Sequence, residues 1–248
     1  MATIYEQGHT INVANFEKMI LTLEAFSDSY QPSNEEITIV QLRAVYEQSK
    51  DAVQEVTTAY TNYTYAVNER QLLFAGIKKL ATKIVNAIIA SGANYKTIED
   101  VKNINQKIQG TSTSRRAALF IDETQQDTTN DTSMRLISNS QQSYNQLTER
   151  FSRLVSLVLA EPKYQPKEQQ TSRNGLVTYL QDLQEANTSV NTQYIALQGA
   201  RNKRNAVLYA PQTGMYDLTM KIKSYIKSVY AQKDPEYKQI FAIRFKRK

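Results

Sequence analysis

The strongest constraint on this chain is an internal repeat, because one pattern of residues occurs twice. Tyr30-Gln31-Pro32 recurs in the second half as Tyr164-Gln165-Pro166, and acidic residues follow within four positions in both places. Before each tripeptide stands a Phe, Phe16 or Phe151, followed by apolar residues at +3, +4 and +7. This spacing is typical of a helix with one buried face. We therefore expect one helical unit that is written twice.

A long helix is predicted after each tripeptide. Apolar residues recur in steps of three and four from Ile39 to Phe74, and the series returns in the second copy with Asn187 and Arg201 as polar interruptions. Alanines flank both series and would let a neighbouring helix approach closely, as in helical bundles. Each copy should contain one helix of about 40 residues, which rises about 60 Å.

Both long helices carry Asn-x-Arg near their ends, as Asn68-Glu69-Arg70 and Asn202-Lys203-Arg204. This duplicated polar helix end has a functional interpretation, in which Arg70 and Arg204 bind an anion or a partner with help from Asn68 and Asn202. In the structural interpretation each arginine packs its stem and places its guanidinium on carbonyls or a carboxylate. We favour the structural interpretation.

Together these patterns predict an all-α protein of two tandem related helical bundles, with three to four helices each. The repeat spans roughly residues 11–109 and again 134–248. We expect a first bundle at 1–109, a Ser/Thr/Asp-rich linker at 110–133 in which Ala117–Ile121 docks onto a bundle, and a second bundle at 134–248. The bundles stack end to end, lie side by side or merge into one pseudo-twofold bundle, and two related bundles are favoured.

The last part of the second copy resembles a family of bacterial tandem-helical proteins with no established activity. The resemblance implies a duplicated helical fold and carries no catalytic or binding residue. It rests on Leu208-Tyr209, Thr213-Gly214, Asp217, Lys227-Ser228-Val229-Tyr230 and Pro235-Glu236-Tyr237-Lys238-Gln239.

Composition argues against most catalytic chemistry. The chain has no Cys and a single His, so thiolate catalysis, Cys-based metal sites and multi-His sites are excluded within one chain. The Glu-x-x-His pattern of di-metal bundles occurs once, at Glu6–His9, ahead of the first predicted helix. We expect His9 to be an ordinary surface residue, and we expect no enzyme activity, no cofactor and no metal.

Sixteen tyrosines stand in the chain, and most of them fall at helical spacing. Tyrosine combines apolar bulk with a polar tip, so core or subcore packing is the favoured interpretation, with base stacking or protein binding as the alternative. Tyr65 does not belong to the apolar series from Ile39 to Phe74, so we expect its side chain on the surface.

Positive charge gathers at the C-terminal end. Residues 201–248 hold twelve Lys or Arg and three acidic residues, a net charge of +9 against −3 for residues 1–200. Such polarity suggests an acidic partner, which is a protein, a membrane surface or nucleic acid. The candidate residues are Lys221, Lys223, Lys227, Arg244, Lys246, Arg247 and Lys248.

The N-terminus shows no signal peptide and the chain no transmembrane segment, so a cytoplasmic location is expected, with export by a dedicated machine left open. The leading hypothesis is a non-enzymatic helical structural or interaction protein that binds a protein partner or assembles as a homo-oligomer. One alternative is nucleic-acid binding through the basic C-terminal region. The other is a soluble helical toxin or pore-forming component.

Overall fold

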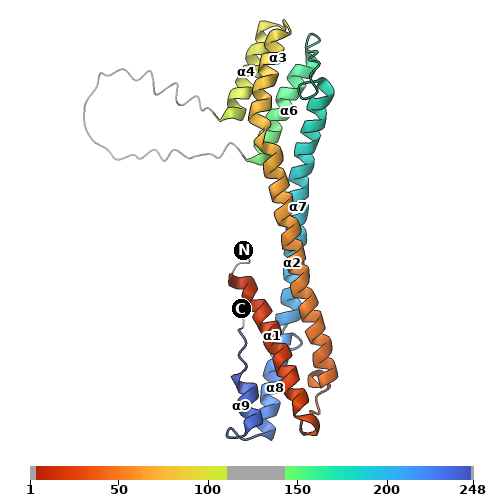
Figure 1. The fold of residues 1–248 in the computed structure, drawn as a ribbon, viewed down its shortest axis with the longest axis vertical. Helices are drawn as coiled ribbons and strands as arrows, with labels where there is room; N and C mark the ends of the chain where they lie inside the picture. The colour runs from red at the N-terminus through yellow and green to blue at the C-terminus, as the bar shows by residue number, and fades with distance from the viewer. Residues whose placement is uncertain (1–3, 111–142, 247–248) are drawn as a thin grey trace, which may run out of the picture. The chain divides into compact units, whose positions relative to one another are not determined.

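The computed structural model describes residues 4–110 and 143–246, which form helices joined by turns and include no strand (Figure 1). The prediction of an all-α protein is confirmed. Most of the predicted linker 110–133, including the expected docking segment Ala117–Ile121, lies outside the described residues.

The helices follow the order that the repeat predicts. In the first half they are α1 (Ile4–Ala25), α2 (Ile39–Ala75), α3 (Ile77–Ala90) and α4 (Tyr95–Gln109), with short 3-10 turns at Ser27–Ser29 and Glu35–Ile37. In the second half they are α6 (Tyr144–Ala160), α7 (Arg173–Tyr209), α8 (Met215–Val229) and α9 (Pro235–Ala242). Both α2 and α7 contain 37 residues and begin at equivalent positions of the repeat, which confirms one long helix per copy.

Local capping explains several of the helix boundaries. The Asn94 side chain accepts a hydrogen bond from the backbone N–H of Lys96 at the start of α4, and the Ser143 side chain accepts one from Gln146 at the start of α6. Helix α4 ends at Gln109 and is capped by Gly110, whose φ of 77° lies in the left-handed region that favours glycine.

The described helices group into two compact units that cut across the repeat. Unit 1 contains Met1–Thr64 and Thr192–Lys248, and unit 2 contains Tyr65–Asn191. The division falls inside α2 and inside α7, so each unit holds one part of each long helix. The arrangement as two tandem bundles is not confirmed, because each unit combines helices from both halves of the sequence.

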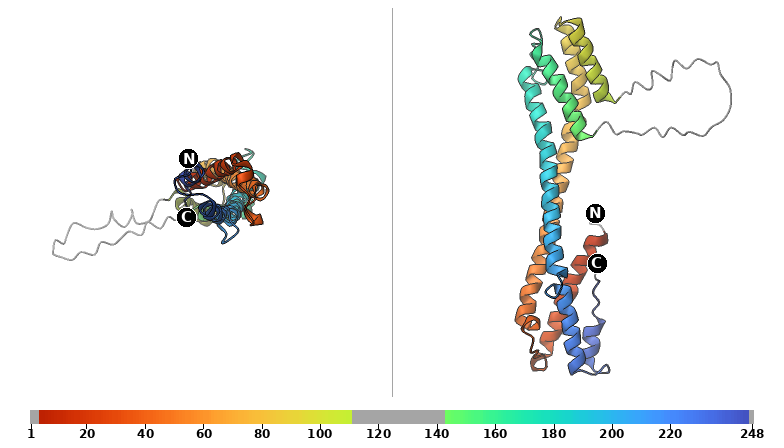
Figure 2. Two further views of the ribbon diagram at one scale, coloured as in Figure 1. Left: turned by 90° about the horizontal axis from the view of Figure 1, so that it is seen from below. Right: turned by 180° about the vertical axis from the view of Figure 1, so that it is seen from behind.

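Unit 1 joins α1 and the first part of α2 to the last part of α7, α8 and α9. In both Figure 1 and Figure 2, α1 lies beside α9 within this unit. Apolar side chains of α1 and α8 form most of its core. The fully buried members are Phe16, Met19, Ile20, Leu42, Leu208, Met215, Ile222, Ile226 and Ile240.

Unit 2 joins α6 and the first part of α7 to the last part of α2, α3 and α4. Helix α4 packs against both α6 and α3. The fully buried members of its core are Ala81, Ile84, Ile88, Val101, Ile108, Phe151, Leu154, Val158, Tyr164, Leu176 and Leu183.

Corresponding positions of the repeat have corresponding burial in the two units. Phe16 of α1 and Phe151 of α6 are both fully buried, and so are Ile84 of α3 and Ile222 of α8. In each unit the first helix of one copy therefore packs with the third helix of the other copy. The repeated apolar faces are complementary, which allows this exchange.

Two tyrosines in the apolar series of the long helices are exposed, although the series predicts that they are buried. Tyr60 is 38% exposed, and Tyr194, its counterpart in the second copy, is 48% exposed. Core packing is therefore wrong for these two residues, although Tyr194 contacts the ring of Tyr63. Tyr65 is 65% exposed, as expected.

Candidate functional site

A tyrosine fixes the loop that carries each Tyr-Gln-Pro tripeptide. The hydroxyl of Tyr30 donates a hydrogen bond to the carbonyl oxygen of Ile37 at 2.6 Å, and Tyr164 donates one to Thr171 at 2.7 Å. Both tyrosines are buried and both bonds close a loop of the same length. Burial raises the pKa of Tyr30 well above its ordinary value and that of Tyr164 to about 12.

In unit 2 an arginine at the start of α7 holds the loop further. Arg173 donates hydrogen bonds to the carbonyl oxygens of Tyr164, Leu159 and Glu161 at 3.0, 2.9 and 2.6 Å. The equivalent position in the first copy is Ile39, which cannot form these side-chain hydrogen bonds. A planar guanidinium with five N–H donors suits three carbonyls at a helix end.

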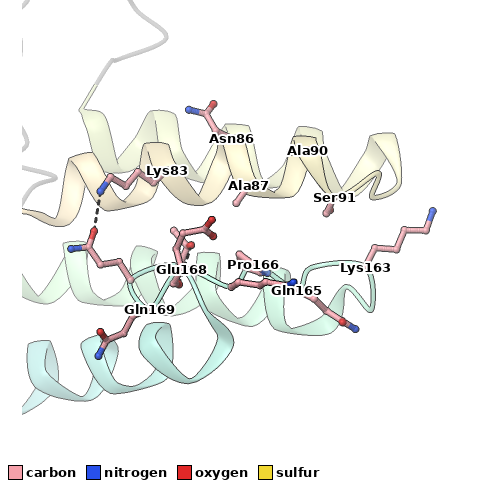
Figure 3. Close-up of a pocket in the computed structure, with 13 residues that line it drawn as sticks. Lys83, Asn86, Ala87, Ala90, Ser91, Lys163, Gln165, Pro166, Glu168 and Gln169 are labelled. Atoms are coloured by element: carbon pink, nitrogen blue, oxygen red, sulfur yellow. Dashed lines mark hydrogen bonds between the residues drawn. The ribbon is translucent and has the colours of Figure 1, made fainter.

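The loop of unit 2 and helix α3 enclose a groove of about 750 Å³, which we call the Lys83 groove (Figure 3). Lys83 and Lys163 lie toward opposite ends of it, and Ala87 on α3 faces Pro166 of the loop (Figure 3). The residues that line the groove are Lys83, Asn86, Ala87, Ala90, Ser91, Lys163, Gln165, Pro166, Lys167, Glu168, Gln169, Gln170 and Thr171.

Unit 1 has a smaller groove of about 410 Å³ at the corresponding place, which we call the Lys221 groove. It lies between α8 and the loop after Pro32, the counterpart of Pro166. Lys221 corresponds to Lys83 in the aligned third helices. The lining residues are Pro32, Ser33, Asn34, Ile37, Met220, Lys221, Ser224 and Tyr225.

The two grooves differ in how their shared lysine is compensated. Lys221 forms an ion pair with Glu36 and also donates to the carbonyl oxygen of Gln212 at 2.9 Å. Lys221 holds the pKa of the Glu36 carboxyl below its ordinary value, through its hydrogen bond and its charge. Residue 170, the counterpart of Glu36, is a glutamine, and Lys83 donates to its neutral side-chain oxygen at 2.9 Å. The charge of Lys83 is thus not neutralised by this contact.

The structure disperses the predicted basic cluster. Lys223 donates to the carbonyl oxygen of Ile243 at 2.7 Å and lies 5.5 Å from the ring centre of Phe241, which Lys227 also approaches at 5.4 Å. Partial burial lowers the pKa of Lys223. Lys223 and Lys227 thus lie against α9 and the residue after it, whereas Lys221 is paired with Glu36 of the loop before α2.

Two further members of that cluster are exposed. Arg244 and Lys246 lie on the extended segment after α9 with their side chains in solvent, whereas Arg247 and Lys248 lie outside the described residues. Nucleic-acid binding through this end of the chain stays a prediction.

The two predicted polar helix ends belong to different units, Arg70 to unit 2 and Arg204 to unit 1. Asn68 and Asn202 are exposed. Arg70 is half-buried with its guanidinium 4.1 Å from the ring centre of Tyr144, and Arg204 is 2% exposed and donates to the side chain of Asn205 at 2.9 Å. Both arginines are thus packed, as the structural interpretation expects, but their guanidinium groups contact an aromatic ring and a side-chain amide, where carbonyls or a carboxylate were expected.

The prediction for His9 is wrong. Helix α1 begins at Ile4, before the predicted start, so His9 lies inside it and is 1% exposed. Its Nδ1 is 2.8 Å from the hydroxyl of Tyr209, which also accepts a hydrogen bond from Asn12 at 3.1 Å. The apolar residues that follow in α1 face the core, and His9 continues the same face.

Sequence reasoning did not identify the two grooves. One available signal was the lysine shared by the aligned third helices at 83 and 221. The described residues contain no group of three or more His, Cys, Asp or Glu positioned for a metal ion. Across residues 4–110 and 143–246, no helix has the length and apolarity needed to cross a membrane.

Comparison with known proteins gives no relative for this chain: no protein-family model, no curated protein and no solved structure matches it.

Proposed function

We propose that this chain is a non-enzymatic interaction protein, a helical scaffold that binds a protein partner or further copies of itself. The observation that carries the proposal is the repeated groove: both units place an open surface groove between a tyrosine-fixed loop and the third helix of the other copy. A surface groove that occurs in both helical units suits recognition of a partner chain.

The proposal includes an origin by duplication of one helical unit. The long helices of equal length, the paired Tyr-Gln-Pro loops and the matching buried positions support it. Two related grooves in one chain give a scaffold two places for partner segments. Binding at two places raises the overall affinity when geometry allows both to be engaged.

A site-specific crosslinking experiment tests the proposal. A photoreactive phenylalanine analogue replaces Ala90, which is exposed in the Lys83 groove, in the full chain expressed in its source cells. The control carries the analogue at Asp100, which is exposed on α4 and does not line the groove. We expect one discrete adduct, with a partner protein or with a second copy, from position 90 only.

Native mass measurement of the purified chain complements the crosslinking. A homo-oligomer or a stoichiometric complex supports the scaffold role. A strict monomer at high concentration, together with no discrete adduct from position 90, would contradict it.

A further inference from the structure

Resting on the proposed function, we infer that the Lys83 groove binds an acidic peptide segment of a partner protein, whereas the Lys221 groove does not. Three features distinguish the Lys83 groove: its floor, the charges around it and its difference from the groove of unit 1.

The floor of the Lys83 groove accepts apolar side chains. Ala87 and Ala90 lie along α3, and Pro166 lies in the facing loop. These side chains are small, so the backbone of a bound segment can approach closely. Burial of apolar surface there would contribute to affinity and offset part of the cost of association.

The charges around this floor favour an anionic segment. Lys83, Lys163 and Lys167 line the groove with Glu168 as its one acidic residue, so the lining carries a net charge of +2. Lys163 donates to the carbonyl oxygen of Gly92 at 2.9 Å, and Lys83 donates to Gln170. Each ammonium group has three N–H donors, so each retains capacity for a carboxylate.

Unit 1 supplies a contrast within the same molecule. In the Lys221 groove, Lys221 is already paired with Glu36. An incoming carboxylate would have to displace Glu36 before it could bind Lys221. In unit 2 the same position is Gln170, which leaves the charge of Lys83 available. The exchange of Glu for Gln at this one position therefore assigns anion binding to the Lys83 groove.

The lining also favours a peptide over a nucleic acid. None of the residues that line the Lys83 groove is aromatic, so no ring offers a stacking platform for bases. Small apolar residues between lysines fit a segment in which acidic and apolar side chains alternate.

The test uses the full chain with ¹³C-labelled alanine methyl groups, and the methyl signals of Ala87 and Ala90 report on the groove. The probe is a short peptide of alternating Glu and Leu, and its control replaces every Glu with Gln. We expect the Glu peptide to shift both signals in a saturable manner and the Gln peptide to leave them unchanged.

Matched variants identify the source of the affinity. Gln170→Glu gives Lys83 the partner that Lys221 has and should weaken the Glu peptide about tenfold or more. Glu36→Gln makes the opposite change in unit 1 and should leave the titration of Ala87 and Ala90 unchanged. Both substitutions are on exposed side chains, so the fold is retained and the alanine spectrum verifies it.

The inference is overturned if the Glu peptide leaves both methyl signals in place, if the Gln peptide binds equally well, or if Gln170→Glu has no effect. A single-stranded oligonucleotide that shifts these signals where the Glu peptide does not would also overturn it. None of these results bears on crosslinking from position 90, so the proposed function is judged separately.

Discussion

Asn12 binds both backbone groups of Lys246. Its Nδ2 donates to the carbonyl oxygen of Lys246 at 2.7 Å, and its Oδ1 accepts from the N–H of Lys246 at 3.1 Å. One turn later on α1, Asn15 donates to the carbonyl oxygen of Arg244 at 2.8 Å. The segment after α9 is thus held on α1 through its backbone, while the side chain of Ile243 enters the core.

Replacing Asn12 with Ala should release this segment. Asn12 is 1% exposed, and its loss leaves the backbone groups of Lys246 and the hydroxyl of Tyr209 without its amide. We expect the free energy of unfolding to fall by about 1–3 kcal/mol, because buried polar groups lose their partners. Urea denaturation measures the change, and amide hydrogen exchange at residues 243–246 should accelerate.

Asn15→Ala is the matched control, since Asn15 is half-buried on the same helix face and makes a single, exposed hydrogen bond. Its effect should stay below about 1 kcal/mol. Equal effects of the two substitutions would show that the bidentate contact of Asn12 has no special weight.

Alkaline pH should destabilise the loop of unit 2 through Tyr164. Its pKa is about 12 in the folded chain and about 10 when unfolded, so the neutral form is favoured by folding. This contribution is fully present below pH 10 and is lost as the pH rises through 12. The difference corresponds to about 2–3 kcal/mol.

Tyr164→Phe isolates that contribution. The variant lacks the hydroxyl, so it should lose about 1 kcal/mol at neutral pH, where the bond to Thr171 is missing. It should also unfold less steeply than the parent chain as the pH rises from 10 to 12. Parallel pH profiles for the two proteins, measured by urea denaturation, would contradict the assigned pKa.

Fragments that divide the chain between α4 and α6 should assemble with each other. Unit 1 needs α1 together with α8 and α9, and unit 2 needs α4 together with α6. Residues 1–110 or 143–248 alone would expose core side chains such as Phe16 or Ile222, at about 1.5–3 kcal/mol each. We expect little helical signal from either fragment alone and a folded one-to-one complex on mixing.

Circular dichroism and native mass measurement check this outcome. Tandem bundles at 1–109 and 134–248 would instead give two fragments that fold independently. Two folded monomers that do not associate would therefore support the tandem arrangement and contradict the exchange of helices between copies.

The repeat in the sequence predicted where the helices lie along the chain, but it did not predict which helices pack against each other. Periodicity identifies the face of a helix that is buried, and Phe16 and Phe151 are buried as the spacing requires. It does not identify the helix that covers this face. Since both copies present matching apolar faces, α1 can pack with the third helix of either copy, and in the structure it packs with the second copy's helices.

The same limit explains why the grooves were missed. Glu36 stands in the first copy and Lys221 in the second, so no comparison within one copy brings them together. The difference between Glu36 and Gln170 is visible in the aligned sequences. Its meaning depends on the packing of each loop against a helix that lies far along the chain.

Asn187 is a buried polar residue on the core-facing side of α7. In unit 2 its Nδ2 donates to the hydroxyl oxygen of Thr148 at 3.0 Å, whereas its buried Oδ1 has no hydrogen-bond partner among the described residues. The counterpart in the first copy is Val53. Thr148 also donates its hydroxyl to the carbonyl oxygen of Tyr144 at 2.9 Å, a bond that does not need Asn187.

Asn187→Val should therefore leave the free energy of unfolding unchanged or raise it by about 1 kcal/mol, because a buried unsatisfied oxygen is removed while Thr148 keeps a partner. Thr148→Val should instead lower it by about 1–3 kcal/mol, because the amide of Asn187 then loses its one bond inside the core. The double variant should recover most of this loss, and a double-mutant cycle by urea denaturation gives the coupling between the two residues. A loss above about 1 kcal/mol for Asn187→Val would mean that the polar pair fixes the packing of α6 on α7, because shape alone would then not be enough.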